Sequence, residues 1–169
     1  MNATEFKQQF LPLNASLYRA AFKLMGNEDD AKDVVQDAYL KLWKMRDSIS
    51  NLDNPLAYCI TIVKNMCLDR HRAASLIIVD KPPEELPLAS NDSASRHIEQ
   101  QQTTQLLNRC LARLPVQQQQ VLRLRDLGGC SMQEIEKATG LTAVNARVLL
   151  SRARKSLRNQ LQNSIQLSS

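Results

Sequence analysis

The stretch Ser131–Leu161, SMQEIEKATGLTAVNARVLLSRARKSLRNQL, contains two helical patterns separated by a glycine. Ser131 followed by Glu134 forms a capping-box pattern, because each side chain can bind a backbone N–H that the first helical turn leaves without a partner. Gly140 favours the left-handed conformation that ends a helix, and Thr142 is suited to begin the next one. A turn of about three residues between two helices predicts a helix-turn-helix.

The helix that begins after Thr142 has two unlike faces when successive residues are projected at about 100° each. Its apolar face is expected to pack on the rest of the domain and consists of Ala146, Leu150, Ala153, Leu157 and Leu161. Its opposite face and flanks combine cationic, polar and valine side chains: Val144, Asn145, Arg147, Val148, Ser151, Arg152, Arg154, Lys155 and Arg158. A face this basic predicts a recognition helix that docks on duplex DNA.

Position along this helix predicts the contact that each side chain makes. The first turns of a recognition helix reach base edges, whereas later lysines and arginines neutralise phosphates. Asn145 and Arg147 are therefore candidate readers of base edges, and Val144 and Val148 are suited to thymine methyl groups. Thr142 joins this DNA-binding set at the start of the helix. The later cations are better suited to phosphate: Arg152, Arg154, Lys155 and Arg158.

The formal net charge of +5 is concentrated in the C-terminal third of the chain. Residues 106–169 hold ten basic and three acidic residues, a net charge of +7, whereas residues 1–72 amount to +1 and residues 73–105 to −3. Such an asymmetry is typical of a domain that binds a polyanion. A solvated basic surface is the alternative that charge alone leaves open.

The composition favours helices throughout, because the 169 residues include only four glycines and are rich in Leu, Ala, Gln, Arg and Lys. We predict an all-α fold of two small helical domains joined by a flexible linker. The first domain is placed at residues 5–73, the linker at 74–97 and the helix-turn-helix domain at 98–163.

The linker is marked by a break in helical periodicity and by three prolines between residues 82 and 87. Its apolar patch, residues 76–79, is expected either to lie in a groove or to form a short strand-like turn on its own domain. Beyond the linker, the polar run Gln117–Gln120 is expected at the surface of a helix.

The segment Asp29–Lys44 predicts a helix with one buried and one polar face. The buried face is apolar: Val34, Val35, Ala38, Tyr39, Leu42 and Trp43. The polar face surrounds Leu40 with charged and amide side chains: Asp33, Gln36, Asp37, Lys41 and Lys44. A lone exposed leucine is common, yet an apolar anchor in a polar ring also describes a docking site for another helix. The residues alone leave both interpretations open.

A second two-faced helix is predicted to begin at Pro55, since proline is well tolerated in a first helical turn. One side is apolar: Leu56, Ile60, Val63 and Cys67. The other side carries Tyr58, Thr61, Asn65, Asp69 and Arg72. An aromatic ring, an amide and a guanidinium on one stripe can stack on and hydrogen-bond an unstacked base. Ordinary polar contacts with neighbouring helices are the alternative.

Metal and cofactor chemistry is not favoured by the residues. The pattern Asp29-Asp30-Ala31-Lys32-Asp33 resembles the Mg²⁺-binding motif of enzymes that ionise prenyl diphosphates, but the chain offers no second acidic cluster. Acidic residues in a first helical turn also complement the helix dipole, and this interpretation is favoured. The four cysteines lack the paired spacing of a zinc site. We expect no metal, no cofactor and no small-molecule substrate.

The expected location is cytoplasmic. No apolar run approaches the ~18 to 20 residues that span a bilayer. Residues 1–10 also lack the apolar core of a signal peptide.

Three motifs, in order, resemble the extracytoplasmic-function (ECF) sigma factors of bacterial RNA polymerase. Asp33–Trp43, DVVQDAYLKLW, is similar to the family's core-binding helix. The predicted helix Pro55–Arg72 resembles the promoter-melting helix of the family. Three further segments resemble its second conserved domain: Leu114-Pro115, Gln133–Ile135 and Ser151–Lys155. Each motif alone is weak, but their order and separation across a proline-rich linker make the resemblance specific.

The resemblance implies a role for each surface. Asp33, Gln36, Asp37 and Leu40 would bind the clamp helices of the polymerase's largest subunit. The C-terminal helix would read the minus-thirty-five element, and the linker would thread polymerase channels toward the RNA exit. Residues of the minus-ten interface would be Lys44, Arg46, Tyr58, Thr61, Asn65 and Arg72.

Within the minus-ten interface, the resemblance implies that Asn65 and the loop Asp47–Asn54 capture a flipped base, while Lys44 and Arg46 track the backbone. Three positions depart from the family's usual residues. Tyr58 replaces Trp, Glu136 replaces a small Ala, and Leu149 replaces a frequent Arg. These departures put the promoter sequence in doubt but leave the family resemblance intact.

The implied partners are core RNA polymerase, promoter DNA and an anti-sigma factor, which in this family is commonly membrane-bound. The chain would not be an enzyme, because the polymerase performs nucleotidyl transfer. The alternative is a stand-alone helix-turn-helix regulator whose N-terminal bundle senses a signal or dimerises. Such a regulator would bind a specific duplex without polymerase.

Overall fold

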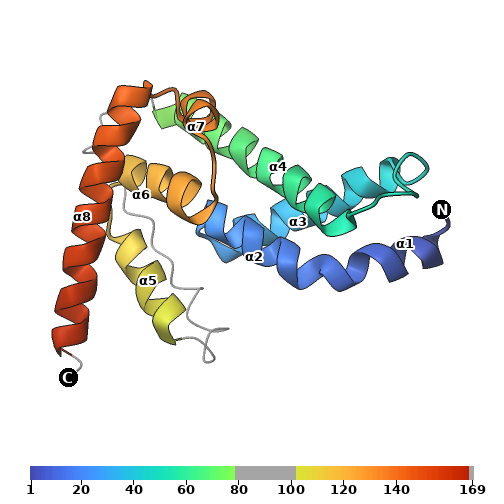
Figure 1. Ribbon diagram of the computed structural model, residues 1–169, viewed down its shortest axis with the longest axis horizontal. Helices are drawn as coiled ribbons and strands as arrows, with labels where there is room; N and C mark the ends of the chain where they lie inside the picture. The colour runs from blue at the N-terminus through green and yellow to red at the C-terminus, as the bar shows by residue number, and fades with distance from the viewer. Residues whose placement is uncertain (79–101, 168–169) are drawn as a thin grey trace. The chain divides into compact units, whose positions relative to one another are not determined.

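A computed structural model of the protein describes residues 1–78 and 102–167 (Figure 1). The described residues contain helices and no strand, which confirms the predicted all-α fold. They form two compact units, one within residues 1–69 and the other within residues 70–169. Most of the predicted linker, including Val79 of its apolar patch, lies outside the described residues.

Four α-helices and a short 3-10 helix supply the first unit: α1 (Ala3–Phe10), η1 (Leu11–Leu13), α2 (Asn14–Met25), α3 (Glu28–Lys44) and most of α4 (Pro55–Ile78). Gly26 ends α2 with a left-handed φ of 73°. Asn27 then begins α3, because its Oδ1 accepts hydrogen bonds from the N–H groups of Asp29 and Asp30 at 2.8 and 3.1 Å. Gly26 and Asn27 therefore form the boundary between α2 and α3.

The core of the first unit lies where α2 packs along α3. Buried apolar side chains on these two helices are Leu17, Ala21, Leu24, Ala31, Val34, Val35, Ala38 and Leu42. The N-terminal helix α1, which no sequence pattern singled out, packs on α3 through aromatic rings. The Phe6 ring centroid is 5.2 Å from the Trp43 ring in an edge-on arrangement, and the Tyr39 hydroxyl donates to the Phe10 carbonyl at 3.1 Å.

Helix α4 is longer than the sequence pattern predicts. Periodicity placed its end near residue 72, and the segment from 76 was expected in a groove or a strand-like turn, but the helix continues to Ile78. Ala73 and Ala74, strong helix formers, follow Arg72. The first proline stands only at residue 82. Helix α4 therefore extends into the first residues of the predicted linker.

The second unit contains the end of α4, α5 (Gln102–Ala112), α6 (Val116–Leu122), a π-helical segment η4 (Arg123–Leu127), α7 (Met132–Thr139) and α8 (Ala143–Leu167). Helix α8 contacts α5, α6 and α7 (Figure 1). Its residues Ala146, Leu150 and Ala153 are buried, as the apolar stripe predicts. Leu157 and Leu161, further along the stripe, are half-buried.

The buried polar side chains of the second unit include Gln120, which was predicted at the surface, and Arg123. Gln120 is not at the surface but lies inside, where its amide nitrogen contacts Ser75 Oγ at 3.0 Å and His71 Nδ1 at 3.1 Å. Arg123 is 2% exposed, and its Nε donates to Gln119 Oε1 at 3.1 Å. Burial lowers the pKa of the Arg123 guanidinium to about 10. The polar glutamine run is therefore partly a packing element.

The four cysteines all lie in the described part of the chain, where they are buried and form no disulfide. Cys59 and Cys67 pack in the first unit and Cys110 and Cys130 in the second. Burial raises the pKa of the Cys59 thiol to about 11. Among the described helices, none combines the length and apolarity needed to cross a membrane.

Gly140 provides a direct test of the turn between α7 and α8. Its φ is 76°, and a Cβ added there would meet no atom within 4 Å. Replacing it with alanine should lower the free energy of unfolding by about 1 to 2 kcal/mol, from backbone strain alone. Gly140→Asn should cost less, because asparagine tolerates this conformation better. Urea unfolding of both variants, followed by circular dichroism, measures the difference; equal losses would exclude backbone strain as the cause.

Candidate nucleic-acid interface

The two helices of the helix-turn-helix are joined as the sequence predicts. Ser131 Oγ accepts the Glu134 N–H at 3.1 Å, and Glu134 Oε1 accepts the Ser131 N–H at 2.9 Å. Helix α7 ends at Thr139 and α8 begins at Ala143, which leaves the three-residue turn Gly140–Thr142. Thr142 Oγ1 accepts the Asn145 N–H at 3.2 Å and so caps α8. These bonds fix where α8 starts relative to α7.

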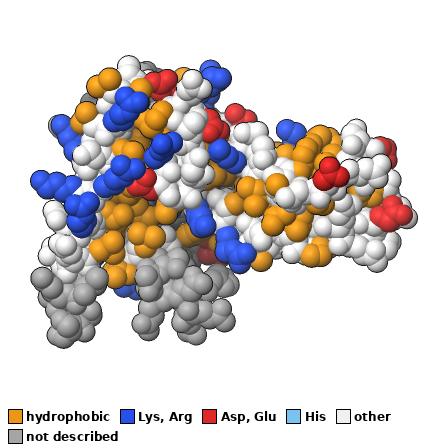
Figure 2. Space-filling model, viewed as in Figure 1, with side chains coloured by type: hydrophobic (Ala, Val, Ile, Leu, Met, Phe, Trp, Pro, Cys, Tyr) orange, Lys and Arg blue, Asp and Glu red, His pale blue; other side chains and the backbone are white. Residues whose placement is uncertain are grey.

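The outer face of α8 holds every residue that was predicted to contact DNA from this helix. All of them are exposed: Val144, Asn145, Arg147, Val148, Ser151, Arg152, Arg154, Lys155 and Arg158. Val144 is 66% and Val148 42% exposed, although both are apolar. Figure 2 shows that Lys and Arg side chains gather over the second unit on the face drawn there. An exposed surface that is cationic and also apolar at its start suits a DNA groove.

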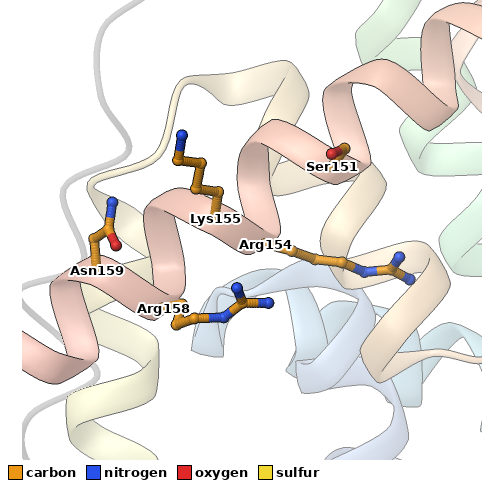
Figure 3. A pocket seen from close by; sticks show the side chains of 5 residues that line it. All are labelled: Ser151, Arg154, Lys155, Arg158 and Asn159. Atoms are coloured by element: carbon orange, nitrogen blue, oxygen red, sulfur yellow. The ribbon is translucent and has the colours of Figure 1, made fainter.

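Along α8, a cavity of about 390 Å³ is lined by Ser151, Arg154, Lys155, Arg158 and Asn159. Three of these five side chains are cationic, and none is acidic. In Figure 3, Arg154 and Arg158 extend toward the same side of the helix, while Lys155 extends in another direction. An anion is the ligand that this lining favours.

Arg154 is already engaged within the protein. Its Nε and Nη2 donate to Asp126 Oδ2 and Oδ1 at 2.8 and 2.6 Å, so the pair is bidentate. The hydrogen bond with Asp126 raises the pKa of Arg154. The sequence pattern predicted a phosphate contact for Arg154 but not its pairing with Asp126, because Asp126 lies 28 residues earlier in the chain. Its phosphate contact stays a prediction.

The polar face of α3 also forms as predicted. Asp33, Gln36, Asp37 and Leu40 are all exposed on it, and Leu40 is 57% exposed. On the opposite face Val34, Val35, Ala38 and Leu42 are buried, while Tyr39 and Trp43 are half-buried. Leu40 is therefore an apolar side chain in water within a ring of polar groups.

The acidic N-terminus of α3 is organised as a helix start. Asn27 binds the N–H groups of Asp29 and Asp30, and buried Glu28 pairs with Lys32 at 2.8 Å. Hydrogen bonding to Glu28 raises the pKa of Lys32. Across the described residues, no three His, Cys, Asp or Glu side chains are grouped so that they could hold a metal ion.

The predicted minus-ten residues on α4 are only partly available. Thr61, Asn65 and Arg72 are exposed, and Tyr58 is half-buried. The Thr61 hydroxyl donates to the Ala57 carbonyl at 3.0 Å, an interaction within its own helix. Asn65 therefore presents its amide to solvent, and its contact with a base stays a prediction.

Lys44 and Arg46, predicted to track a DNA backbone, differ in their surroundings. Lys44 is exposed. Arg46 is half-buried, with its guanidinium carbon 4.1 Å from the centre of the Trp43 ring. Its Nη1 also donates to the Trp43 carbonyl at 2.9 Å. Arg46 therefore helps to end α3, a role that the sequence did not predict.

Comparisons with known proteins match these units in order. The models Sigma-70 region 2 and Sigma-70, region 4 match residues 12–76 and 104–157. The RNA polymerase sigma-E factor of Streptomyces avermitilis is 30% identical over 159 residues, covering 94% of this chain and 86% of that protein. In Mycobacterium tuberculosis, the ECF RNA polymerase sigma factor SigJ is 28% identical over 90% of this chain, and the probable ECF sigma factor SigI is 27% identical over 85%. The chain spans about half the length of these two relatives, 50% and 51%.

A solved structure shares the fold. The sigma factor RpoE from Bartonella quintana, crystallised in complex with the anti-sigma factor NepR, matches with a TM-score of 0.51 and 24% identity. The match covers 95% of this chain and 98% of that chain. At this identity the likeness supports the fold alone.

A helical region 2 unit followed by a region 4 helix-turn-helix defines a class of promoter-recognition protein. The chain belongs to the ECF family of RNA polymerase sigma factors, which act in transcription initiation. Sigma factors are non-enzymatic initiation factors. The resemblance stated from the sequence motifs is confirmed.

The contact between Arg46 and Trp43 can be tested through the only tryptophan in the chain. Arg46→Ala should lower the free energy of unfolding by about 0.5 to 1 kcal/mol, the range for a cation–π contact near a surface. It should also change the emission of Trp43, because the guanidinium above the ring is lost. Lys44→Ala removes a neighbouring exposed charge and is the control. Identical emission spectra for the two variants would contradict the contact.

Proposed function

We propose that this chain recruits core RNA polymerase through the exposed face of α3 and positions it on promoters with the two DNA-binding surfaces on α4 and α8. The observation that carries the proposal is Leu40, 57% exposed in the middle of a polar ring. The order of the two matched regions supports it. Nucleotidyl transfer belongs to the polymerase, so this chain itself needs no catalytic group.

The α3 face has the composition of a protein-binding hot spot. Leu40 would enter an apolar pocket of the partner, and Asp33, Gln36 and Asp37 would exclude water around it. Two carboxylates in this ring favour a partner surface that carries basic residues. The clamp helices of the polymerase's largest subunit are the partner that family membership suggests.

The proposed DNA-binding roles combine the family resemblance with the exposure of most of these side chains. Asn65, together with the loop Asp47–Asn54, would hold a flipped base of the minus-ten element, with Tyr58, Thr61 and Arg72 beside it and Lys44 and Arg46 along the backbone. The first turns of α8 would read the minus-thirty-five element through Asn145 and Arg147. The later cations would contact phosphates, with Arg154 acting from its pair with Asp126.

Control by an anti-sigma factor is a further part of the proposal. The Bartonella quintana sigma factor with this fold was crystallised with such a protein. A partner of this kind that covers α3 or α8 would keep the chain from polymerase or DNA. The place of action would be the cytoplasm, where RNA polymerase works.

Run-off transcription tests the function as a whole. Core polymerase together with the full chain should yield discrete transcripts from a subset of genomic fragments, and neither component alone should do so. A stand-alone regulator instead predicts tight, specific binding of one duplex by the chain without polymerase. Specific duplex binding without any polymerase-dependent transcript would therefore reject the sigma proposal in favour of the regulator.

The polymerase-binding face is tested by Leu40→Ala and Asp37→Lys. Both should abolish pull-down of core polymerase, and Leu40→Ala should weaken affinity by about 30-fold or more if Leu40 contributes about 2 kcal/mol as a hot spot. Leu11→Ala is a matched control, because Leu11 is 50% exposed but lies on η1. Circular dichroism should show the same helix content in all variants. Unchanged pull-down with Leu40→Ala would remove α3 from the interface.

A further inference from the structure

Asp126, to which no DNA-binding role has been given, lies in the π-helical segment that precedes the helix-turn-helix. Local bonds hold this segment in place: the Gly128 N–H donates to the Arg123 carbonyl at 2.8 Å, and Arg125 Nη1 donates to the Cys130 carbonyl at 2.8 Å. The Asp126 carboxylate therefore stands on a fixed backbone. Its two oxygens accept hydrogen bonds from Nε and Nη2 of Arg154 on α8.

The pair leaves part of the Arg154 guanidinium available. Arginine has five N–H donors, and Asp126 engages two of them. The edge formed by Nη1 and Nη2 is the fork that binds phosphate through two parallel hydrogen bonds. The Arg154 side chain is 48% exposed, so a large ligand can reach it. Most exposed ion pairs contribute little to stability, but a bidentate arginine–carboxylate pair is an exception, so the experiment has to separate a structural role from a role in binding.

The surroundings of Arg154 favour the same ligand. The cavity on α8 is lined by Arg154 together with Ser151, Lys155, Arg158 and Asn159. Arg154 and Arg158 extend to the same side of the helix (Figure 3). Hydroxyl and amide groups complete a set of donors around the cations.

We propose that Asp126 is a positioning residue, which holds the outer edge of the Arg154 guanidinium toward one phosphate of duplex DNA in this cavity. The proposal rests on the proposed function, in which α8 docks on DNA. A long arginine side chain that is free in solution loses rotamer entropy when it binds. Asp126 removes much of that cost before DNA arrives.

The opposite role would be competition, in which Asp126 occupies Arg154 and must release it before phosphate binds. Removing the carboxylate separates the two. Asp126→Asn raises the formal net charge by one, from +5. Competition, or simple electrostatics, therefore predicts tighter binding of DNA, whereas positioning predicts weaker binding.

Fluorescence anisotropy of the full chain with a fluorescein-labelled duplex, across a series of salt concentrations, decides between them. Asp126→Asn should weaken binding by about three- to tenfold, as expected when one long side chain must be ordered on binding. Glu136→Gln makes the same charge change on α7 and should leave binding unchanged or slightly tighter. Arg154→Lys should retain the salt dependence, because the charge stays, yet lose affinity.

The double variant guards against a folding artefact. In an Arg154→Ala background, Asp126→Asn should cause no further weakening. A loss of the same size in that background would make Asp126 merely structural and overturn the proposal. Binding with Asp126→Asn that equals or exceeds binding with Glu136→Gln would also overturn it. If the unaltered chain bound no duplex even at low salt, α8 would lack the phosphate contacts that the positioning role needs, and this proposal would fail, whereas run-off transcription would still test the proposed function separately.

Discussion

The packing of α8 against α5, α6 and α7 is the interaction on which the second unit depends. Its buried stripe alternates small and large side chains, with Ala146 and Ala153 at 1% and 0% exposure on either side of Leu150. Small residues let neighbouring helices approach closely, so the stripe fixes the rotation of α8 about its axis. That rotation decides which side chains face outward. The cap at Thr142 and the left-handed Gly140 fix where the helix starts. The DNA-facing surface is therefore a consequence of how the opposite face is packed.

Charge counting overstates the positive charge that this protein can offer to DNA. Arg123 is buried and bound to Gln119, Arg46 lies over Trp43, and Arg154 is paired with Asp126. Arg123, at 2% exposure, serves the fold alone, whereas Arg46 and Arg154 contact a neighbouring side chain and can still reach a ligand. The planar guanidinium allows both contacts at once, because one edge can bind a group of the protein while another edge stays exposed to a ligand. Lysine at the same positions would supply the charge without the geometry.

Local signals made much of the fold predictable. The capping box at Ser131, the stop at Gly140 and the exposed Leu40 each depend on residues within one or two helical turns, so sequence spacing is sufficient to detect them. The pairs that were missed join distant residues: Asp126 with Arg154, 28 apart, and Gln120 with Ser75, 45 apart. Helix α4 continues past residue 72, where the sequence pattern ends, because Ala73 and Ala74 favour a helix and the first proline stands only at residue 82. The same holds for the candidate site. Helical periodicity predicted which faces are exposed, whereas the role of each face was implied by the resemblance to the family.

The buried cysteines have a consequence for the protein in solution. Two thiols lie in each unit, Cys59 and Cys67 in the first and Cys110 and Cys130 in the second, and all four are buried. A thiol reacts as its thiolate, and only when solvent reaches it. Alkylation of these residues therefore requires local or global opening of the unit that contains them. The rate at which the cysteines of each unit are alkylated therefore reports how often that unit opens. Because each unit has its own pair of thiols, the two opening rates can be followed separately in the natural sequence.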